Sequence, residues 1–236
     1  MQGSTRREFV KSSVVAGAAT ATVVTPAAAA QSGASPGGTI KILAISCSPR
    51  KGKSTAAALG VCLQAAKEFS PRTETELIEL AGLNINGNVA AGIPLPPGQQ
   101  DDFPKLVPTL ADPRVRGIII GTPVYFGNMS SLCRAFLERC IVLYQDKFAL
   151  SNKVAGVVAV GGTRNGGQEV TIQSVQISLF CNEMIVVGNG RPGPRHGATV
   201  WSGAEGGVLK DEIGMTTVKA LGRRVAEVAL RIAGPG

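Results

Sequence analysis

The chain has 236 residues, of which 44% are hydrophobic, 17% charged and 4% aromatic, and its formal net charge is +8. This length and apolar content suffice for one sizeable core, so no second domain is required. The basic residues are scattered and form no run with interleaved aromatics, so we expect no nucleic-acid partner. One histidine and five cysteines without C-x-x-C spacing disfavour a zinc site.

The first thirty residues have the pattern of an export signal peptide. The run Thr5-Arg6-Arg7-Glu8-Phe9-Val10-Lys11 resembles a twin-arginine signal, and small residues at 28–30 offer a cleavage site. The intervening stretch 14–30 contains Gly, Pro and Thr and is a poor spanning helix, although an N-terminal membrane anchor is the alternative. We expect a signal peptide at 1–30, a linker at 31–38, and a domain at 39–236. The predicted location is periplasmic or otherwise extracytoplasmic, without stable membrane insertion once the signal is removed.

The rest of the chain alternates between strand-like and helix-like patterns. We expect strands at 40–46, 74–80, 116–121, 153–160 and 184–188, and helices at 53–69, 101–111, 130–147, 168–181 and 210–233. Gly, Pro and Asn mark 81–100 as a long loop. Five Val- and Ile-rich strands separated by helices predict an α/β fold with a doubly wound five-stranded parallel sheet flanked by helices. Ligands of such sheets bind at the carboxyl ends of the strands.

The turn after the first strand, Ser46–Thr55, is rich in hydroxyls and positive charge and opens a helix. Free N–H groups and the helix dipole make such a turn a phosphate site. Three interpretations stand: a nucleotide P-loop, a plain capped turn, or the phosphate loop of a flavin mononucleotide (FMN). Gly52-Lys53-Ser54-Thr55 matches the end of the P-loop pattern. However, Cys47 stands where that pattern opens with glycine, and no later strand ends in a Walker B aspartate, which disfavours a nucleotide triphosphatase.

Two later loops favour the FMN interpretation. Residues 121–129 read Gly-Thr-Pro-Val-Tyr-Phe-Gly-Asn-Met and residues 161–169 read Gly-Gly-Thr-Arg-Asn-Gly-Gly-Gln-Glu, and each follows a predicted strand. Glycine lets the backbone approach a ligand closely, Pro123 stiffens its turn, and Tyr125 and Phe126 offer aromatic surface. A flat, tricyclic ring needs walls of this kind.

These stretches resemble known flavoproteins. The 121–130 and 166–174 segments are similar to the flavin loops of NAD(P)H:quinone oxidoreductases of the tryptophan-repressor-binding-protein type. The 48–55 loop resembles NADPH-dependent FMN reductases and iron–sulfur flavoproteins, and the likeness covers most of 40–230. The resemblance implies a flavodoxin-like fold, non-covalent FMN, NAD(P)H as a possible electron donor, and a homodimer or homotetramer. It also implies a small-molecule electron acceptor or a redox partner protein.

The resemblance assigns cofactor-binding roles to residues of all three loops. The phosphate would be held by Ser46, Ser48, Arg50, Lys53, Ser54 and Thr55. The ring would be held by Pro123, Val124, Tyr125, Phe126, Gly127 and Asn128, and by Gly161, Gly162, Thr163, Arg164, Asn165, Gly166 and Gly167. Arg164 is expected near the pyrimidine edge of the flavin.

Two departures from these families shape the remaining expectations. Residues 84–100 contain no cysteine, although iron–sulfur flavoproteins carry a cysteine cluster there, so we expect no iron–sulfur cluster. The histidine that the quinone oxidoreductases carry after the fourth strand has no equivalent at 180–183, which leaves His196 as the candidate catalytic residue. Nearby, residues 188–193 fit G-x-G-x-x-G, but Pro192 and Pro194 prevent a helix from opening there, so we reject a dinucleotide site.

The sequence therefore predicts an FMN-dependent oxidoreductase that uses NAD(P)H to reduce a quinone, a flavin or a similar acceptor. Because NAD(P)H is not expected outside the cytoplasm, the alternative is an exported flavodoxin-like electron carrier without NAD(P)H turnover of its own. A flavin-binding module without turnover is a third possibility. In each case the cofactor carries the electron chemistry and the protein orients it.

Overall fold

The structure is a computed structural model that describes residues 38–234. The predicted signal peptide at 1–30, and all but the last residue of the 31–38 linker, lie outside the described residues. Within the described range, no helix combines the length and the apolar character that crossing a bilayer requires.

The sheet follows the order β2-β1-β3-β5-β6 along its main path. The strands of this path are β2 (Thr73–Glu79), β1 (Ile40–Ser46), β3 (Val115–Tyr125), β5 (Val154–Gly161) and β6 (Ile185–Val186), and all pair in parallel. Two further strands are β7 (Ala198–Trp201), parallel to β5, and β4 (Asn128–Met129), antiparallel to β3. The α/β fold with a parallel sheet flanked by helices is confirmed, and within residues 38–234 the five strands of the main path are joined by two more that the sequence did not predict.

The two additional strands have separate origins. The fifth position of the sheet is shared, because β6 pairs with the first residues of β5 while β7 pairs with its last four. The intervening residues 187–197, rich in Gly and Pro, leave the sheet and return to it. The other addition, β4, forms a hairpin with the end of β3, which continues four residues beyond its predicted end at Gly121.

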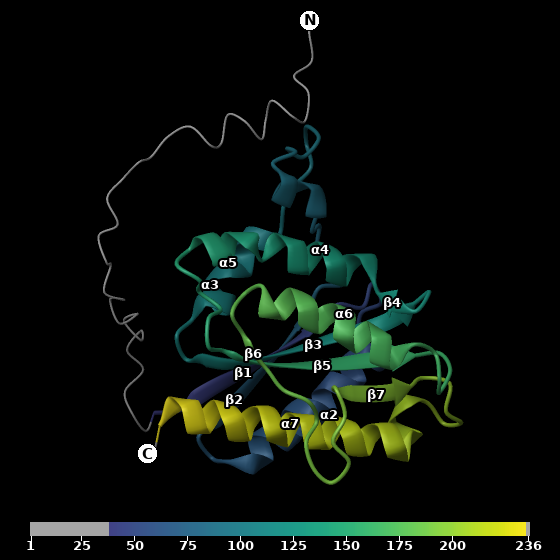
Figure 1. Ribbon diagram of the computed structural model, residues 1–236. Helices are drawn as coiled ribbons and strands as arrows, with labels where there is room; N and C mark the ends of the chain where they lie inside the picture. The colour runs from purple at the N-terminus through teal and green to yellow at the C-terminus, as the bar shows by residue number, and fades with distance from the viewer. Residues whose placement is uncertain (1–37, 235–236) are drawn as a thin grey trace, which may run out of the picture. The chain divides into compact units, whose positions relative to one another are not determined.

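Helices cover both faces of the sheet (Figure 1). One face carries α2 (Ser54–Phe69) and α7 (Glu212–Ala233), and the other carries α3 (Val107–Ala111), α4 (Ser131–Arg139), α5 (Ile141–Gln145) and α6 (Gln168–Phe180). Short 3₁₀ segments lie at Gly87–Ala91, Phe103–Lys105 and Val208–Lys210. The helix predicted at 130–147 is two helices that meet at Cys140, and the one predicted at 101–111 is a 3₁₀ turn followed by α3.

Alternating side chains of the strands build one core on each side of the sheet. In β3, Ile118 and Ile120 join the cluster beneath α3–α6, while Ile119 joins the cluster beneath α2 and α7. On the second side α2 and α7 cross closely at Gly222, where a Cβ atom would overlap the carbonyl of Cys62. The strands are thus buried on both faces, as their Val- and Ile-rich sequences indicate.

The cysteines behave as small core residues. Cys47, Cys62, Cys133 and Cys140 are buried and unpaired, and Cys181 is exposed. Burial raises the pKa of the Cys62 and Cys140 thiols to about 12. The Cys62 and Cys140 thiols therefore stay protonated at neutral pH and pack as hydrophobes.

Candidate functional site

The strand register brings the three predicted loops to one edge of the sheet. Ser46 of β1 lies opposite Gly121 of β3, and Pro123 of β3 lies opposite Val160 of β5. The chain leaves each of these parallel strands in the same direction, so the loops 47–53, 126–127 and 162–167 are neighbours. This edge is where doubly wound sheets bind ligands.

The first loop has the features of a phosphate site. Helix α2 begins after Lys53, and no side chain among residues 38–234 caps its N-terminus, so its first N–H groups are free of partners there. Ser48 Oγ accepts a hydrogen bond from the Arg50 N–H (3.1 Å), and Glu79 Oε2 at the end of β2 accepts one from the Gly52 N–H (2.7 Å). These two bonds hold the turn in shape ahead of the helix.

The positive charges of this loop and the hydroxyl at its base are available to a ligand. Within residues 38–234, no carboxylate pairs with Arg50, Lys51 or Lys53, and all three are exposed. The hydroxyl of Ser46, at the base of the loop, is buried and has no hydrogen-bond partner in the described part of the chain. A buried hydroxyl normally has a hydrogen-bond partner, so the Ser46 hydroxyl can still bond a ligand at the base of the loop.

The second loop is a tight hairpin whose tip is aromatic. Phe126 (φ 50°) and Gly127 (φ 73°) form its turn, and Tyr125 pairs with Asn128 across it. Phe126 projects fully into solvent and Tyr125 is 42% exposed. The hairpin thus presents aromatic surface beside the carboxyl edge of the sheet, where the sequence predicts one wall of a ring site.

A single serine connects the first two loops. Ser130 caps α4 by accepting a hydrogen bond from the Cys133 N–H (3.1 Å), and its hydroxyl donates to the Cys47 carbonyl (2.7 Å). Its own N–H donates to the hydroxyl of Thr122 (3.1 Å). Because these groups are buried, the phosphate loop and the base of the hairpin are fixed relative to each other.

The third loop is shaped by Gln168, the first residue of α6. Its side-chain carbonyl accepts from the Gly166 N–H (2.8 Å), and its amide donates to the Thr163 carbonyl (2.6 Å). Gly167 adopts φ 94°, and a Cβ atom there would lie 3.0 Å from the Cα of Gly127. The second and third loops therefore touch through two glycines, neither of which another residue could replace without strain.

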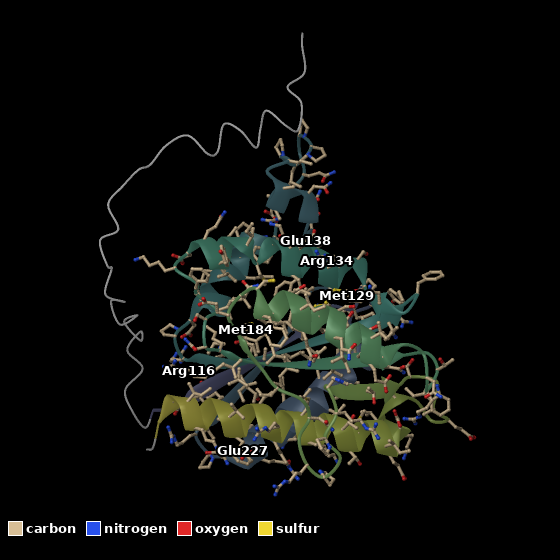
Figure 2. All side chains as sticks on the ribbon, viewed as in Figure 1. Arg116, Met129, Arg134, Glu138, Met184 and Glu227 are labelled. Atoms are coloured by element: carbon tan, nitrogen blue, oxygen red, sulfur yellow. The ribbon has the colours of Figure 1, made fainter. Side chains whose placement is uncertain are left out.

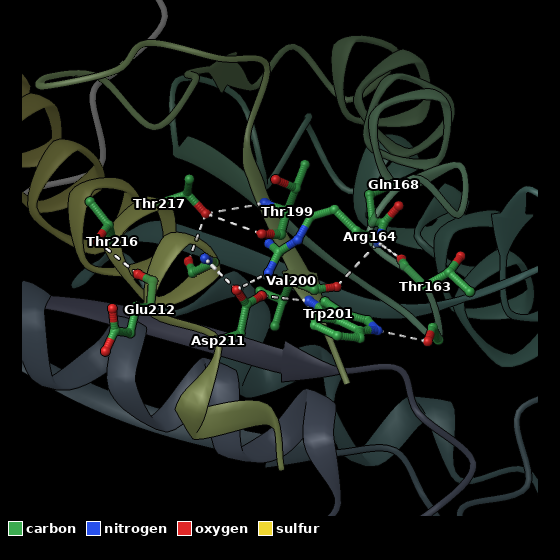
Figure 3. Close-up of polar contacts among 12 residues, drawn as sticks. Thr163, Arg164, Gln168, Thr199, Val200, Trp201, Asp211, Glu212, Thr216 and Thr217 are labelled. Atoms are coloured by element: carbon green, nitrogen blue, oxygen red, sulfur yellow. Dashed lines mark hydrogen bonds and ion pairs between the residues drawn. The ribbon is translucent and has the colours of Figure 1, made fainter. Parts of the chain in front are cut away.

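An ion-pair network anchors the third loop to β7 and α7 (Figure 3). Arg164 donates to the buried carboxylate of Asp211 (2.6 Å) and lies over the Trp201 ring, with its guanidinium carbon 5.3 Å from the ring centroid. The Trp201 indole N–H donates to the Gly162 carbonyl (2.9 Å). Asp211 also accepts from the backbone N–H groups of Trp201 (2.7 Å) and Gly214 (3.0 Å).

This network keeps Asp211 charged. Burial favours the neutral acid, but the hydrogen bonds from Arg164, Gly214 and Trp201 outweigh it and lower the pKa of Asp211. The predicted position of Arg164 at a flavin edge remains a prediction, and in the structure its guanidinium is engaged by Asp211.

His196 makes its polar contacts elsewhere. Its ring Nε2 lies 3.3 Å from the Gln173 amide, and its carbonyl accepts from the Gln176 amide (2.6 Å). Both glutamines belong to α6, and the histidine is exposed. Within the part of the chain that the structure describes, its hydrogen bonds do not involve the three loops, and its catalytic role stays a prediction.

Comparison with known proteins identifies the family. The model of the family "NADPH-dependent FMN reductase" matches residues 40–194. The chain belongs to this family. An iron–sulfur flavoprotein of Methanocaldococcus jannaschii is 37% identical over 80% of this chain and 97% of its own length. An iron–sulfur flavoprotein of Methanosarcina thermophila is 35% identical over 80% of this chain and 95% of its own.

Solved structures share the fold of this chain. RosB, solved with bound 8-demethyl-8-formylriboflavin-5'-phosphate, has a TM-score of 0.64 at 17% identity, over 82% of this chain and 80% of RosB. A flavodoxin, WrbA-like protein from Agrobacterium tumefaciens has a TM-score of 0.55 at 18% identity, over 82% of this chain and 98% of that one. At these identities the likeness concerns the fold, which is flavodoxin-like.

The relatives' names raise the question of an iron–sulfur cluster in this family member. Between residues 38 and 234, no group of three or more His, Cys, Asp or Glu side chains is placed to hold a metal ion. The 81–100 loop, which carries no cysteine, packs its 3₁₀ turn Gly87–Ala91 beside α4. The expectation that the protein lacks a cluster stays a prediction.

Several residues that shape the site escaped the sequence analysis. Ser130, Gln168 and Asp211 support the loops from behind, and Glu79 holds the phosphate loop from the neighbouring strand. Asp211 carried a usable signal, because an Asp before a helical pattern is a favoured N-cap. The bonds that join Ser130 to Cys47 and Glu79 to Gly52 link residues 83 and 27 positions apart, so nothing local indicated these two contacts.

Proposed function

We propose that the protein binds FMN at the edge formed by these three loops and acts as an oxidoreductase that takes electrons from NAD(P)H. Membership of the NADPH-dependent FMN reductase family supports the assignment to FMN-dependent oxidoreductases. The structural observation that carries the proposal is the meeting of an uncapped, cationic helix N-terminus with an aromatic hairpin at one sheet edge.

The residues of the site suit FMN. The hydroxyls of Ser46 and Ser54, the cations Arg50 and Lys53, and the free N–H groups of α2 provide donors for the phosphate. The hydroxyl of Ser48 bonds to the backbone of Arg50 and shapes the turn around the phosphate. Tyr125 and Phe126 offer apolar surface for the ring, and the backbone of the Gly161–Gly167 loop offers N–H groups. Bound FMN would supply hydride and electron transfer, while these residues bind and orient it.

The acceptor we propose is a quinone, a flavin or a similar small molecule. No nucleophile or acid–base pair is required, because the protein's part is to bind, orient and shield the cofactor. The exposed Phe126 and Tyr125 leave room for a second flat molecule to pack against the same hairpin.

A twin-arginine pattern near the N-terminus favours the electron-carrier alternative. The twin-arginine pattern at 5–11 supports export to an extracytoplasmic space, where NAD(P)H is not expected. Replacing both Arg6 and Arg7 with Lys should then retain the protein in the cytoplasm, as fractionation would measure. Secretion of the double-lysine variant at the wild-type level would contradict the export proposal.

Anaerobic spectroscopy separates the two functions. The full chain is reconstituted with FMN, its flavin spectrum is recorded, and NADH or NADPH is added in a stopped-flow mixer. Rapid bleaching supports the reductase, whereas bound flavin that bleaches only with dithionite or a protein reductant supports the carrier. A folded protein that stays colourless with excess FMN would contradict both.

The phosphate loop provides the matching mutational test. Lys53→Gln removes one unpaired cation from the loop, so FMN affinity should fall about tenfold, in keeping with one lost charge-assisted hydrogen bond. Lys67→Gln is the control, because Lys67 is exposed in the last turn of the same helix. Titration of FMN fluorescence measures the affinity of both variants. Equal affinities would contradict the assignment of this loop to the FMN phosphate.

A further inference from the structure

An arginine-lined cavity lies against α7. It has a volume of about 560 Å³ and is bounded by the second half of α7 and by the 187–197 segment that interrupts the fifth strand. Its charged side chains are Arg191, Arg223, Arg224, Arg231 and Glu227. Four guanidinium groups against one carboxylate give the cavity a net charge of +3. Glu227, labelled in Figure 2, marks its place on α7.

Two of the four arginines are free to bind a ligand. Glu227 already pairs with Arg224 (3.0 Å) and Arg231 (2.6 Å), which holds these two side chains against the helix. In the described part of the chain, no carboxylate and no hydrogen-bond acceptor pairs with Arg191 or Arg223. Glu227 neutralises only one of its two partners, so of the net charge of +3 one unit lies on Arg191 of the loop and two lie on α7, including Arg223.

The loop wall is built to keep its shape. The buried Asn189 accepts from the Arg195 N–H (2.6 Å) and donates to the Gly193 carbonyl (3.2 Å), closing the loop on itself. Gly190, at φ 70°, lies against the aliphatic stem of Arg224, because a Cβ atom there would come within 3.4 Å of it. This G-x-G-x-x-G run opens no helix, yet it forms a preorganised wall over α7.

The cavity is separate from the proposed FMN site. Helix α7 begins next to the Arg164–Asp211 pair, and Arg223 lies eleven residues farther along, or roughly 16 Å at 1.5 Å per residue. A ligand in the cavity would therefore not share the residues that the three loops offer to a flavin.

We propose that this cavity binds a small soluble anion that carries phosphate groups and at least two negative charges. One guanidinium group donates two parallel N–H bonds to a phosphate, and the two unpaired arginines that line the cavity, one on the loop and one on α7, suit a ligand with two phosphate groups, of which pyrophosphate is the simplest. The volume is that of a small-molecule site. The lining contains no aromatic side chain, so nothing there would stack on a nucleobase.

Pyrophosphate binding to the FMN-saturated full chain tests the proposal. Calorimetry at constant ionic strength should show one site in the wild type. The affinity should fall at least about tenfold in Arg191→Gln/Arg223→Gln, whose two residues are exposed, so the fold should persist and the melting curve should be unchanged. Arg134→Gln is the matched control, an exposed arginine on α4, on the other face of the sheet (Figure 2).

Each other outcome overturns the proposal. Absence of pyrophosphate binding, or equal binding by the double variant, would leave the cavity without this ligand. Binding that FMN abolishes, or that Lys53→Gln removes while the double variant retains it, would place the anion in the phosphate loop instead. Vesicles with anionic lipid that bind through Arg191 and Arg223, when pyrophosphate does not, would assign the cavity to a membrane surface. If the protein takes up no FMN, the same titration without FMN still tests the cavity.

Discussion

At the scale of single residues, Lys153 is a buried lysine that the proposed chemistry does not use. It immediately precedes β5, and its ammonium donates to the carbonyls of Leu110 (3.0 Å) and Asp112 (2.8 Å). Burial lowers the pKa of Lys153 to about 8, an effect that the nearby Asp112 only partly offsets. The lysine thus joins the end of α3 to the start of β5, at the edge of the sheet opposite the three loops.

This depressed pKa predicts a pH dependence of stability. In the unfolded chain the lysine keeps its proton up to about pH 10.4, so between about 8 and 10.4 the unfolded state binds more protons than the folded state. Stability from this residue therefore rises with pH across that window, by up to about 3 kcal/mol. The wild-type minus Lys153→Met difference in unfolding free energy should grow from pH 7.5 to 10 in urea titrations.

The control for this series is Lys105→Met, because the Lys105 side chain is 69% exposed. Its difference from the wild type should stay flat over the same range. A flat difference for Lys153→Met as well would mean that the lysine titrates normally in the folded protein.

At the scale of elements, an ion pair holds the long 81–102 segment onto α4. Arg139, whose side chain is 5% exposed, makes two hydrogen bonds with Asp101 (2.9 and 2.5 Å) and one with the Asn86 carbonyl (3.3 Å). Its guanidinium carbon also lies 4.9 Å from the centroid of the Phe103 ring. One arginine of α4 therefore fixes both ends of the segment that is predicted to carry no cluster.

Asp101→Asn should destabilise the protein by about 3–5 kcal/mol, because it leaves the buried Arg139 without its counter-charge. The hydrogen bonds from Arg139 lower the pKa of Asp101, so the stability that the pair provides is present above pH 3.8 and lost as the pH falls below it. Glu138→Gln, which breaks the exposed pair with Arg134, should cost less than about 1 kcal/mol. Chemical denaturation at pH 7 compares the two, and equal small losses would contradict the buried-pair account.

The same scale shows which elements the sequence could predict. β1 begins and ends at the predicted residues, because its apolar run is bounded by clear turn signals. The hairpin of β3 and β4 was missed, since it depends on Phe126 adopting a left-handed conformation that few such residues accept. β7 was missed because the Gly- and Pro-rich 187–197 segment interrupts the strand pattern between β6 and β7.

The candidate site was also predictable from the sequence only in part. The three loops were predictable, because each follows an apolar strand and parallel strands end at one edge. Their supports were not, since the Arg164–Asp211 pair joins residues 47 positions apart in the sequence. The helix break at Cys140 had no local signal either, as no Gly or Pro stands there.

At the scale of the whole molecule, an apolar stripe on α6 supports the proposed homodimer or homotetramer. Val170, Ile177 and Phe180 are 58%, 65% and 60% exposed, and the exposed Phe126 lies on the hairpin that contacts the start of this helix. An exposed apolar stripe of this kind is typical of an interaction surface.

Ile177→Asp should therefore shift the protein toward smaller species in sedimentation velocity, because it places a charge in the stripe. Ile213→Asp is the matched control, since Ile213 is 66% exposed on α7, on the other face of the sheet. Identical distributions for wild type and Ile177→Asp, with an oligomer present in both, would assign the interface elsewhere.

The hydroxyl of Ser130 has a consequence for what the molecule can select. One oxygen atom bonded to the Cys47 carbonyl and the Cys133 N–H sets the span between the anionic end and the planar end of the proposed ligand. This fixed span should select ligands by the length of the chain that joins their anionic end to their planar end. A compound with a shorter or longer chain between its two ends would contact only one of the two loops. Selectivity among nucleotides would therefore depend on the Ser130 hydrogen bonds as well as on the groups that touch the ligand.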